Sequence, residues 1–200
     1  MNAFEYIVSK YKVDLSKPSP TRLPISRNAE FPDLLKELGM MKGVELGVYK
    51  GKYSEILMNR MPGLDLTAVD SWKAYKGYKD YPDADLEINA FNQAKTRSQT
   101  RGFKILQDWS VDASRKFEDE SLDFIYIDSN HDFAHVIEDL AAWSPKVKKG
   151  GIISGHDFFE SRQERYGVVY ALPAWCAYRG VPMLFIMNSD GVPSWFYVKP

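Results

Sequence analysis

The chain has 200 residues, of which 44% are apolar and 26% are charged, and its formal net charge is −1. This balance is typical of a single globular domain and provides no positive field for binding nucleic acid or an anionic membrane, so neither partner is expected. The one cysteine, Cys176, excludes an intrachain disulfide and favours a reducing compartment. The first residues, MNAFEYIVSKYK, lack the apolar core of a signal peptide, and no apolar run approaches the roughly 20 residues that span a bilayer. We therefore expect a soluble, cytoplasmic protein.

Residues 1–40 are predicted to be an accessory segment with two helices and a candidate lid, ahead of the main domain at 41–200. Helical spacing relates the apolar residues Phe4, Ile7, Val8 and Tyr11. The stretch LSKPSPTRLPIS contains three prolines and should be extended. A second helix is predicted from Pro32, a residue favoured in a first turn, to Gly39.

From residue 42 onwards, apolar runs alternate with helical patterns. The predicted strands are Gly43–Leu46, Leu64–Val69, Phe103–Leu106, Leu122–Ile127 and Gly151–Ser154. The predicted helices are Tyr53–Met61, Asp85–Arg101, a short one near Asp112–Phe117, Phe133–Trp143, and one near Val168–Tyr178 that is interrupted or restarted at Pro173. MLFIMN, the turn SDG and SWFYVK then form a hairpin signature. The pattern predicts an α/β fold with a doubly wound, Rossmann-like sheet of seven strands, mostly parallel, with a C-terminal antiparallel hairpin.

In such a sheet, ligands bind outside the carboxyl ends of the strands, and three aspartates, Asp70, Asp108 and Asp128, lie at predicted strand ends. The first strand leads into VELGVYKGKYSE, whose E-x-G-x-x-x-G spacing lets the backbone approach a ligand. An ordinary strand–turn–helix with two turn glycines is the alternative interpretation. In AVDSW, the carboxylate of Asp70 is placed to accept hydrogen bonds from a ribose, and Trp72 could pack on a base. The candidate cofactor-binding residues are Glu45, Gly47, Gly51, Ser54, Asp70, Ser71, Trp72, Asp108, Trp109, Ser110 and Asp128.

Together, E-x-G-x-x-x-G at Glu45–Gly51, the strand end at Asp70, and KKGGII at 148–153 resemble the class I S-adenosylmethionine-dependent methyltransferases. The stretch IDSNHDFAHVIEDLAAWSPKVKKGGIISGHDF looks more specifically like the metal-dependent O-methyltransferases typified by macrocin and mycinamicin O-methyltransferases, with a more distant kinship to catechol O-methyltransferase. The resemblance covers roughly residues 40–160. It implies S-adenosyl-L-methionine as cofactor, a divalent cation (Mg²⁺ or Mn²⁺) and a small-molecule hydroxyl acceptor that is sugar-like or aromatic. A homo-oligomer is left open.

The resemblance also assigns roles to the residues after the fourth and fifth strands. Asp128 matches the first metal-binding aspartate and belongs to the catalytic centre, and His131 matches the histidine that acts as general base in the sugar-modifying members. His156 and Asp157 match the pair that completes the metal site, although many relatives have Asp or Glu where this chain has His156. An imidazole there favours softer ions than magnesium, or does not ligate at all. His135 is interpreted as a structural or solvent-facing helix residue.

Two segments are predicted to choose the substrate: residues 72–85, with Tyr75, Tyr78 and Tyr81, and the proline-rich residues 16–26 as a lid. Three other functions remain alternatives. A methyltransferase acting on a macromolecule is disfavoured by the neutral charge balance. A non-catalytic module that binds an S-adenosyl ligand would not need a base beside a metal site. A nicotinamide oxidoreductase is disfavoured because G-x-G-x-x-G is missing. The sequence does not name the methyl acceptor.

Overall fold

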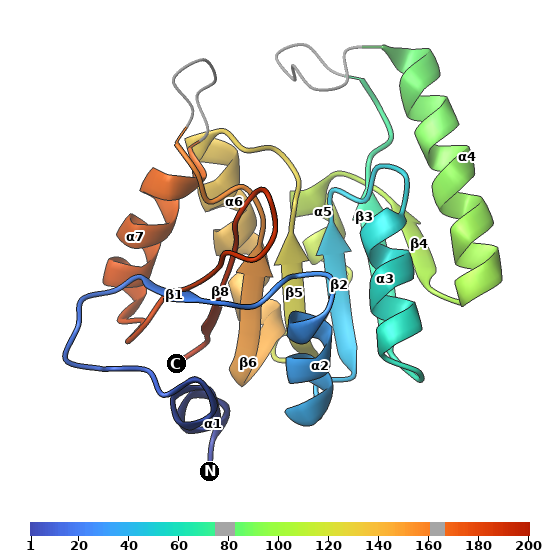
Figure 1. The fold of residues 1–200 in the computed structure, drawn as a ribbon. Coiled ribbons are helices and arrows are strands. Elements are labelled where there is room, and N and C mark those ends of the chain that lie inside the picture. Colours follow the sequence, from blue (N-terminus) through green and yellow to red (C-terminus); the bar gives the residue numbers. More distant parts are fainter. Residues whose placement is uncertain (75–82, 161–166) are drawn as a thin grey trace.

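The computed structural model describes residues 1–74, 83–160 and 167–200, which form a sheet with helices on both faces (Figure 1). The helices are α1 (Ala3–Tyr11), α2 (Glu30–Glu37), α3 (Lys52–Arg60), α4 (Ala84–Arg101), α5 (Ser110–Ser114), α6 (Phe133–Trp143) and α7 (Val168–Arg179), with a 3-10 turn, η1 (Ser144–Lys146), after α6. The strands are β1 (Thr21–Leu23), β2 (Lys42–Leu46), β3 (Asp65–Asp70), β4 (Lys104–Gln107), β5 (Leu122–Ile127), β6 (Val147–Gly155), β7 (Phe185–Met187) and β8 (Ser194–Val198). Among these described residues, none of the helices combines the length and the apolar content needed to cross a bilayer.

The sheet has the strand order β1-β7-β8-β6-β5-β2-β3-β4. Neighbouring strands are parallel except β8, which is antiparallel to both β6 and β7. The predicted doubly wound fold and its C-terminal hairpin are therefore confirmed. The predicted count of seven strands is corrected to eight within the described part of the chain, because β1 from the proline-rich stretch pairs in parallel with β7. The prolines flank these three residues rather than lying among them, so every residue of β1 keeps a main-chain N–H that can donate to a neighbouring strand.

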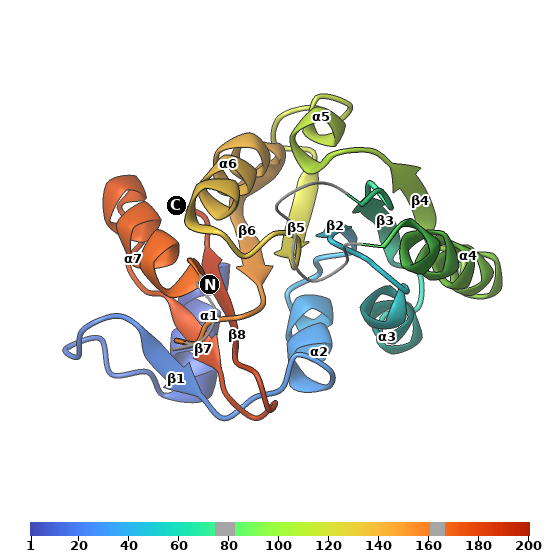
Figure 2. The same cartoon turned by 90° about the horizontal axis from the view of Figure 1, so that it is seen from above.

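The helices cover the sheet in two layers, which Figure 2 shows from above. One apolar core lies under α1 to α4, and a second lies under α5 to α7. Side chains of β5 alternate between them: Phe124 and Tyr126 belong to the first core, and Ile125 and Ile127 to the second. Because both faces of the central strands are buried, their sequences read as unbroken apolar runs. Residues 1–40 contribute to the first core, which contains Ile7 of α1, Leu23 of β1, and four residues of α2 or just after it, Phe31, Leu34, Leu35 and Met40.

Two predicted helix features differ in the structure. Helix α2 begins at Glu30 rather than at Pro32, which lies inside the first turn, where the missing N–H of proline is tolerated. Helix α7 runs without interruption through Pro173, so the predicted break there is wrong. Its buried stripe continues on both sides of the proline, with Leu172 before it and Trp175 after it. Packing of that stripe offsets the roughly 3 kcal/mol that a proline costs inside a helix.

The strand order places the crevice of the fold between β2 and β5. After β2 the chain builds β3 and β4 on one side, then crosses to β5 on the other side of β2. At such a switch point the loops that follow the two strands separate and leave room for a ligand. The strand ends are tied together by main-chain hydrogen bonds, from Gly47 N to Val69 O (3.0 Å) and from Asp128 N to Leu46 O (2.9 Å). The carboxyl ends of β2, β3 and β5 therefore form one rigid edge.

Candidate active site

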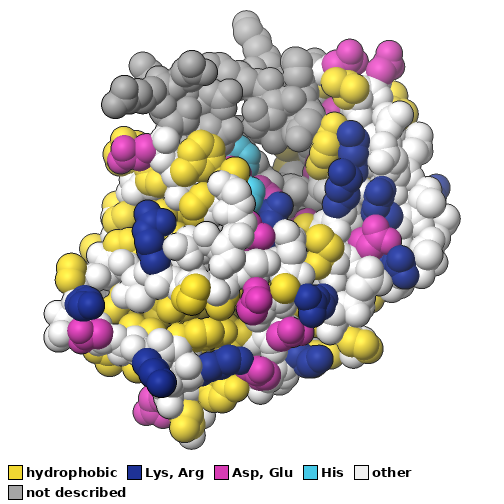
Figure 3. All heavy atoms as spheres, in the orientation of Figure 1, with side chains coloured by type: hydrophobic (Ala, Val, Ile, Leu, Met, Phe, Trp, Pro, Cys, Tyr) yellow, Lys and Arg dark blue, Asp and Glu magenta, His cyan; other side chains and the backbone are white. Residues whose placement is uncertain are grey.

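A cavity of about 500 Å³ opens at this edge of the sheet. Its volume lies within the range of small-molecule sites. Figure 3 shows a hollow on this side of the molecule, with histidine and charged side chains at its rim. Nine of the sequence-predicted site residues line the cavity: Glu45, Gly47, Asp70, Ser71, Asp108, Trp109, Ser110, Asp128 and His131. The parallel strands thus bring together carboxylates that are far apart in the sequence.

Asp70 closes β3 and organises the loops around the cavity. Its carboxylate accepts hydrogen bonds from the main-chain N–H groups of Tyr49 and Trp72, each at 2.8 Å. Burial raises the pKa of Asp70, and these hydrogen bonds oppose the rise because they stabilise the charged form. The main-chain N–H groups of Val48 and Ser71 oppose the rise as well, and Asp70 lines the cavity.

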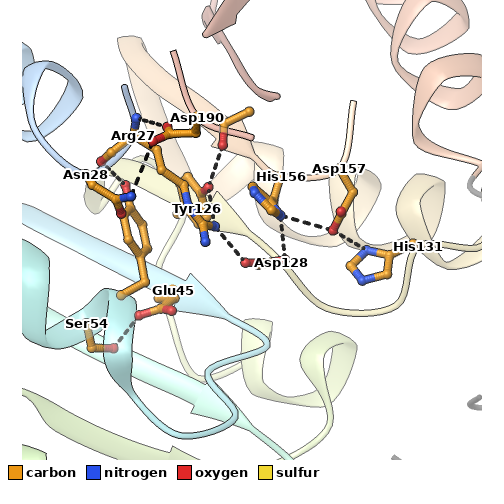
Figure 4. Close-up of polar contacts among 12 residues, drawn as sticks. Arg27, Asn28, Glu45, Ser54, Tyr126, Asp128, His131, His156, Asp157 and Asp190 are labelled. Carbon is orange, nitrogen blue, oxygen red and sulfur yellow. Dashed lines mark hydrogen bonds and ion pairs between the residues drawn. The ribbon is translucent and has the colours of Figure 1, made fainter. Parts of the chain in front are cut away.

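Glu45 is almost fully buried in the wall of the cavity, where the Ser54 hydroxyl donates a hydrogen bond to its carboxylate (Figure 4). Burial raises the pKa of Glu45 to about 8; the Ser54 hydrogen bond opposes the rise, and the negative charge of Asp128 adds to it. Below that pH this side chain is neutral. It can then donate as well as accept a hydrogen bond.

Three residues predicted to bind the cofactor do not line the cavity and pack against other parts of the fold: Gly51, Ser54 and Trp72. A Cβ on Gly51, whose φ is +74°, would lie 3.2 Å from the Cα of Ala94, so the glycine admits helix α4. Ser54 is buried and bonded to Glu45. The Trp72 ring packs on Phe91 with 5.0 Å between ring centroids, and its indole N–H donates to the Tyr49 carbonyl (2.7 Å). These three residues pack behind the residues that line the cavity.

The start of α5 and the loop after β5 are held together by a carboxylate that the sequence interpretation missed. Asp139 of α6 is buried, and its carboxylate accepts hydrogen bonds from the hydroxyls of Ser110 (2.5 Å) and Ser129. The indole N–H of Trp143 also donates to the Ser110 hydroxyl (3.0 Å). Burial raises the pKa of Asp139, and the two serine hydroxyls oppose the rise. An acidic residue on the otherwise apolar face of a predicted helix was the available signal.

The carboxyl ends of β5 and β6 bring together two aspartates and two histidines (Figure 4). The Nδ1 atoms of His131 and His156 each lie 3.2 Å from Asp157 Oδ2. His156 Nδ1 is also 3.7 Å from Asp128 Oδ1. Ligand atoms of Asp128, His131 and Asp157 all lie within 4.8 Å of one another, an arrangement that could hold a metal ion. The third member of this group is thus His131, whereas the sequence interpretation chose His156 as the ligand.

The two aspartates of this group have opposite pKa shifts. Burial raises the pKa of Asp128, and the charge of Asp157 adds to the rise against the opposing effect of His156. Burial also acts to raise the pKa of Asp157, but its hydrogen bond with His156 and the neighbouring positive charges outweigh that effect and lower it. Asp157 has a left-handed backbone, with φ of +60°. Such a conformation in a non-glycine residue is uncommon and is often found at functional sites.

Arg27 is a second residue that the sequence did not indicate. It follows β1, and its guanidinium Nη1 donates to Asp128 Oδ2 (3.2 Å) and to the Tyr126 hydroxyl (3.1 Å). The partners lie about a hundred positions apart along the chain, so no local pattern could reveal the pair. His135 also lines the cavity from α6, half exposed and 3.7 Å from Asp132. The predicted substrate residues Tyr75, Tyr78 and Tyr81 lie outside the described residues.

Several solved structures of other proteins are similar to this one. The chain is similar in structure to a caffeoyl-CoA O-methyltransferase candidate from Staphylococcus aureus (TM-score 0.63, 14% identity, 98% of this chain and 90% of that chain). Similar structures also include an O-methyltransferase from Bacillus cereus in complex with SAH (0.58, 13%, 98% and 88%) and the SAH-bound methyltransferase PaMTH1 from Podospora anserina (0.60, 10%, 87% and 78%). At these identities the likeness shows the fold alone. No curated protein sequence gives a significant match to the chain.

The sequence itself matches a family model described as a methyltransferase domain over residues 44–158, more than half of the chain. These residues run from β2, through the glycine turn, to Phe158 just after Asp157. The narrower resemblance to the macrocin and mycinamicin enzymes stays a prediction. The chain therefore belongs to the methyltransferase-domain family, and the class that its motifs predicted, the class I S-adenosylmethionine-dependent methyltransferases, is confirmed.

Proposed function

We propose that the protein is an O-methyltransferase that transfers the methyl group of S-adenosylmethionine to a hydroxyl of a sugar-like or aromatic small molecule. In this proposal His131 is the general base, and Asp128 and Asp157 are ligands of a divalent cation. The observation that carries the proposal is that Asp128 and His131 line the same cavity as the glycine turn and the strand-end carboxylates. With Asp157 they form a group within 4.8 Å.

The cofactor would lie over the ends of β2, β3 and β4. Gly47 presents bare main chain to the cavity, and Asp70 supplies a carboxylate for the ribose hydroxyls. The adenine ring of the cofactor would fit in the part of the cavity that is lined by Asp108, Trp109 and Ser110. The methyl sulfonium needs no further activation, so the protein has to align the acceptor oxygen, the methyl carbon and the sulfur for in-line displacement.

His131 is held in a way that suits proton abstraction. Asp157 faces its Nδ1, which favours the tautomer that has a proton on Nδ1 and a basic Nε2. In Figure 4 this second ring nitrogen points away from Asp157. The main-chain carbonyl of His131 accepts a hydrogen bond from Gly167 (2.7 Å), which fixes the backbone. Asp157 therefore orients His131, which takes the proton from the acceptor hydroxyl.

The donor set fits a divalent cation. Two carboxylates and an imidazole within 4.8 Å can surround an ion at the usual ligand distances of about 2.0–2.2 Å after small side-chain shifts. A mixed oxygen and nitrogen set favours manganese, iron or zinc over magnesium. A divalent cation bound there would lower the pKa of a substrate hydroxyl. The protein's own part is to hold Asp128 and Asp157 at adjacent strand ends.

The same geometry favours a second role for His131, as the third ligand of the cation. The two roles predict different results for His131→Ala. A base contributes to turnover but not to Mn²⁺ affinity, whereas a ligand contributes to both. Measuring Mn²⁺ binding to this variant by electron paramagnetic resonance therefore separates them.

The proposal is tested first by ligand binding and then by catalysis. Calorimetry should show that S-adenosylhomocysteine binds, and that Asp70→Asn weakens this binding by roughly 10- to 100-fold, as expected for a lost charge-assisted hydrogen bond. Binding of NAD in its place would contradict the cofactor assignment. A panel of hydroxylated sugars and catechols should then yield a methylated product by mass spectrometry. Cofactor binding without any methyl transfer would instead favour the non-catalytic module.

The cation is tested separately from the cofactor. Activity should fall in EDTA and return with manganese, and Asp157→Asn should weaken Mn²⁺ binding without changing S-adenosylhomocysteine affinity. Full activity in excess EDTA would remove the cation from the proposal. His131 would then remain as the proposed base.

A further inference from the structure

Arg27 brings a fixed positive charge to the carboxylate that the proposed cation would use. Its guanidinium lies 3.2 Å from Asp128 Oδ2, and the side chains of both residues are only about one-fifth exposed, at 22% and 21%. The same guanidinium nitrogen donates to the Tyr126 hydroxyl, which is buried and also hydrogen-bonded to Ser194 (3.0 Å). A partly buried ion pair of this kind is screened far less by solvent than a surface pair.

The position of Arg27 is fixed by contacts from two other parts of the chain (Figure 4). Its main-chain N–H donates to the carboxylate of Asp190 (2.6 Å), in the turn between β7 and β8. The neighbouring Asn28 side chain donates to the second oxygen of that carboxylate (3.3 Å). On the other side, the guanidinium lies over the Tyr53 ring at 5.2 Å, and the Tyr53 hydroxyl donates to the Arg27 carbonyl (3.2 Å). Arg27 is therefore held in place at both its main chain and its guanidinium.

A guanidinium and a divalent cation cannot both be accommodated at Asp128 without cost. Both draw on the same carboxylate, and two positive charges a few ångströms apart repel each other strongly at a site with little solvent. A cation at Asp128 and Asp157 would therefore have to weaken or displace the ion pair of Arg27. Displacement would also break the hydrogen bond of the guanidinium with Tyr126 and its contact with the Tyr53 ring, whereas Asp190 holds the main chain of Arg27 separately.

We propose that Arg27 competes with the divalent cation for Asp128 and thereby sets a low cation affinity. Arg27 is thus a positioning residue: its ion pair holds Asp128 in the absence of the cation, and this ion pair breaks when the cation binds. The inference rests on the proposed function in one respect, namely that Asp128 and Asp157 are the cation ligands.

The experiment measures Mn²⁺ binding directly, by the loss of the free-ion signal in electron paramagnetic resonance. Arg27→Met removes the charge and should tighten Mn²⁺ binding at least tenfold relative to the wild type. Arg27→Lys keeps the charge and should stay within about threefold of the wild type. Arg60→Met, which removes an exposed ion pair with Asp33, is the matched control and should leave binding unchanged. S-adenosylhomocysteine affinity is measured on the same samples.

The outcomes separate this inference from the proposed function. If Arg27→Met binds Mn²⁺ no more tightly than the wild type, while Asp157→Asn weakens binding, the inference fails and the cation site stands. If no variant binds Mn²⁺ at millimolar concentrations, both the inference and the proposed cation fail, whereas retained S-adenosylhomocysteine binding would leave the methyltransferase intact. Circular dichroism checks folding. Arg27→Gln, which keeps hydrogen-bond donors without the charge, replaces Arg27→Met if that variant unfolds, with the same tightening expected.

Discussion

Replacing Gly47 with alanine should damage the join between the two central strands. Gly47 follows β2 with φ of +78°, a left-handed conformation that costs an L-residue roughly 1–2 kcal/mol. A Cβ built on it would lie 2.0 Å from the carbonyl oxygen of Asp128 and 2.6 Å from the Cα of Ser129. Real Cβ atoms essentially never come within 3.0 Å of such atoms. Because both contacts are main chain, no side-chain rotation relieves them, and the ends of β2 and β5 must move apart.

The size of the effect follows from these two terms. The overpacking adds about 1–3 kcal/mol to the backbone strain, so Gly47→Ala should destabilise the fold by roughly 2–5 kcal/mol. Gly39→Ala is the matched control, because Gly39 has φ of +71° and, among the described residues other than its own chain neighbours, no heavy atom lies within 4 Å of its Cβ position. The control should lose only the backbone term, roughly 1–2 kcal/mol. Urea unfolding of the two variants and the wild type, followed by circular dichroism, gives both differences.

Equal destabilisation of the two variants would refute the reasoning, because the contact with Asp128 would then contribute nothing to the loss of unfolding free energy in Gly47→Ala. Gly47→Ala should also weaken S-adenosylhomocysteine binding, whereas Gly39→Ala should not, since Gly39 lies at the opposite end of β2 from the cavity. The sequence interpretation gave Gly47 the role of making room for the cofactor. In the structure it also makes room for the main chain of Asp128, so one glycine sets the position of two parts of the site.

The remaining predictions concern side chains around the cavity. His131→Ala should leave folding and cofactor affinity nearly unchanged and lower turnover about 10²–10⁴-fold, the usual contribution of a general base, whereas His135→Ala should cost little; equal losses in the two variants would exclude His131 as the base. Because burial raises the pKa of Glu45 from 4.5 to about 8, the native state keeps a proton that the unfolded chain releases, so stability should fall as pH rises through this window. Urea midpoints of Glu45→Gln should fall less than those of the wild type between these pH values, and parallel curves would contradict the shift. Asp139→Ala should destabilise by about 1.5–3 kcal/mol in urea, because two serine hydroxyls lose a charged acceptor, and an unchanged midpoint would show that water replaces it.

Much of the central sheet could be predicted because its local signals agree with one another. The run Leu122–Ile127 is apolar throughout and ends at a carboxylate, and β5 has those bounds. Helix α6 also has its predicted bounds, Phe133–Trp143, and Asp132 caps its start by accepting from the N–H of Ala134 (2.9 Å). Once the strands are parallel, their carboxyl ends must share an edge. The meeting of Asp70, Asp108 and Asp128 at one cavity therefore follows from the pattern alone.

Features that depend on distant partners could not be predicted in this way. Strand β1 is three residues long and exists because β7 offers it an edge. Neither its length nor its composition distinguishes it from an extended loop. Pro173 is a local signal for a break, but packing of α7 on both sides of the proline outweighs it. Arg27 shows the same limit at the site, because its ion pair with Asp128 depends on how the segment after β1 crosses the sheet.

The predicted cofactor residues that do not line the cavity show what local sequence leaves undetermined at a strand end. A turn glycine and a tryptophan after a strand indicate that something packs closely there, but they do not say whether it is a ligand or a helix. For Gly51 and Trp72 it is α4, which brings Ala94 against the first and Phe91 against the second. The choice depends on which side of the strand end the following helix covers. Gly51 and Trp72 face α4 and belong to the packed interior. Asp70, which lies between them in the sequence, lines the cavity, where its carboxylate is accessible to a ligand.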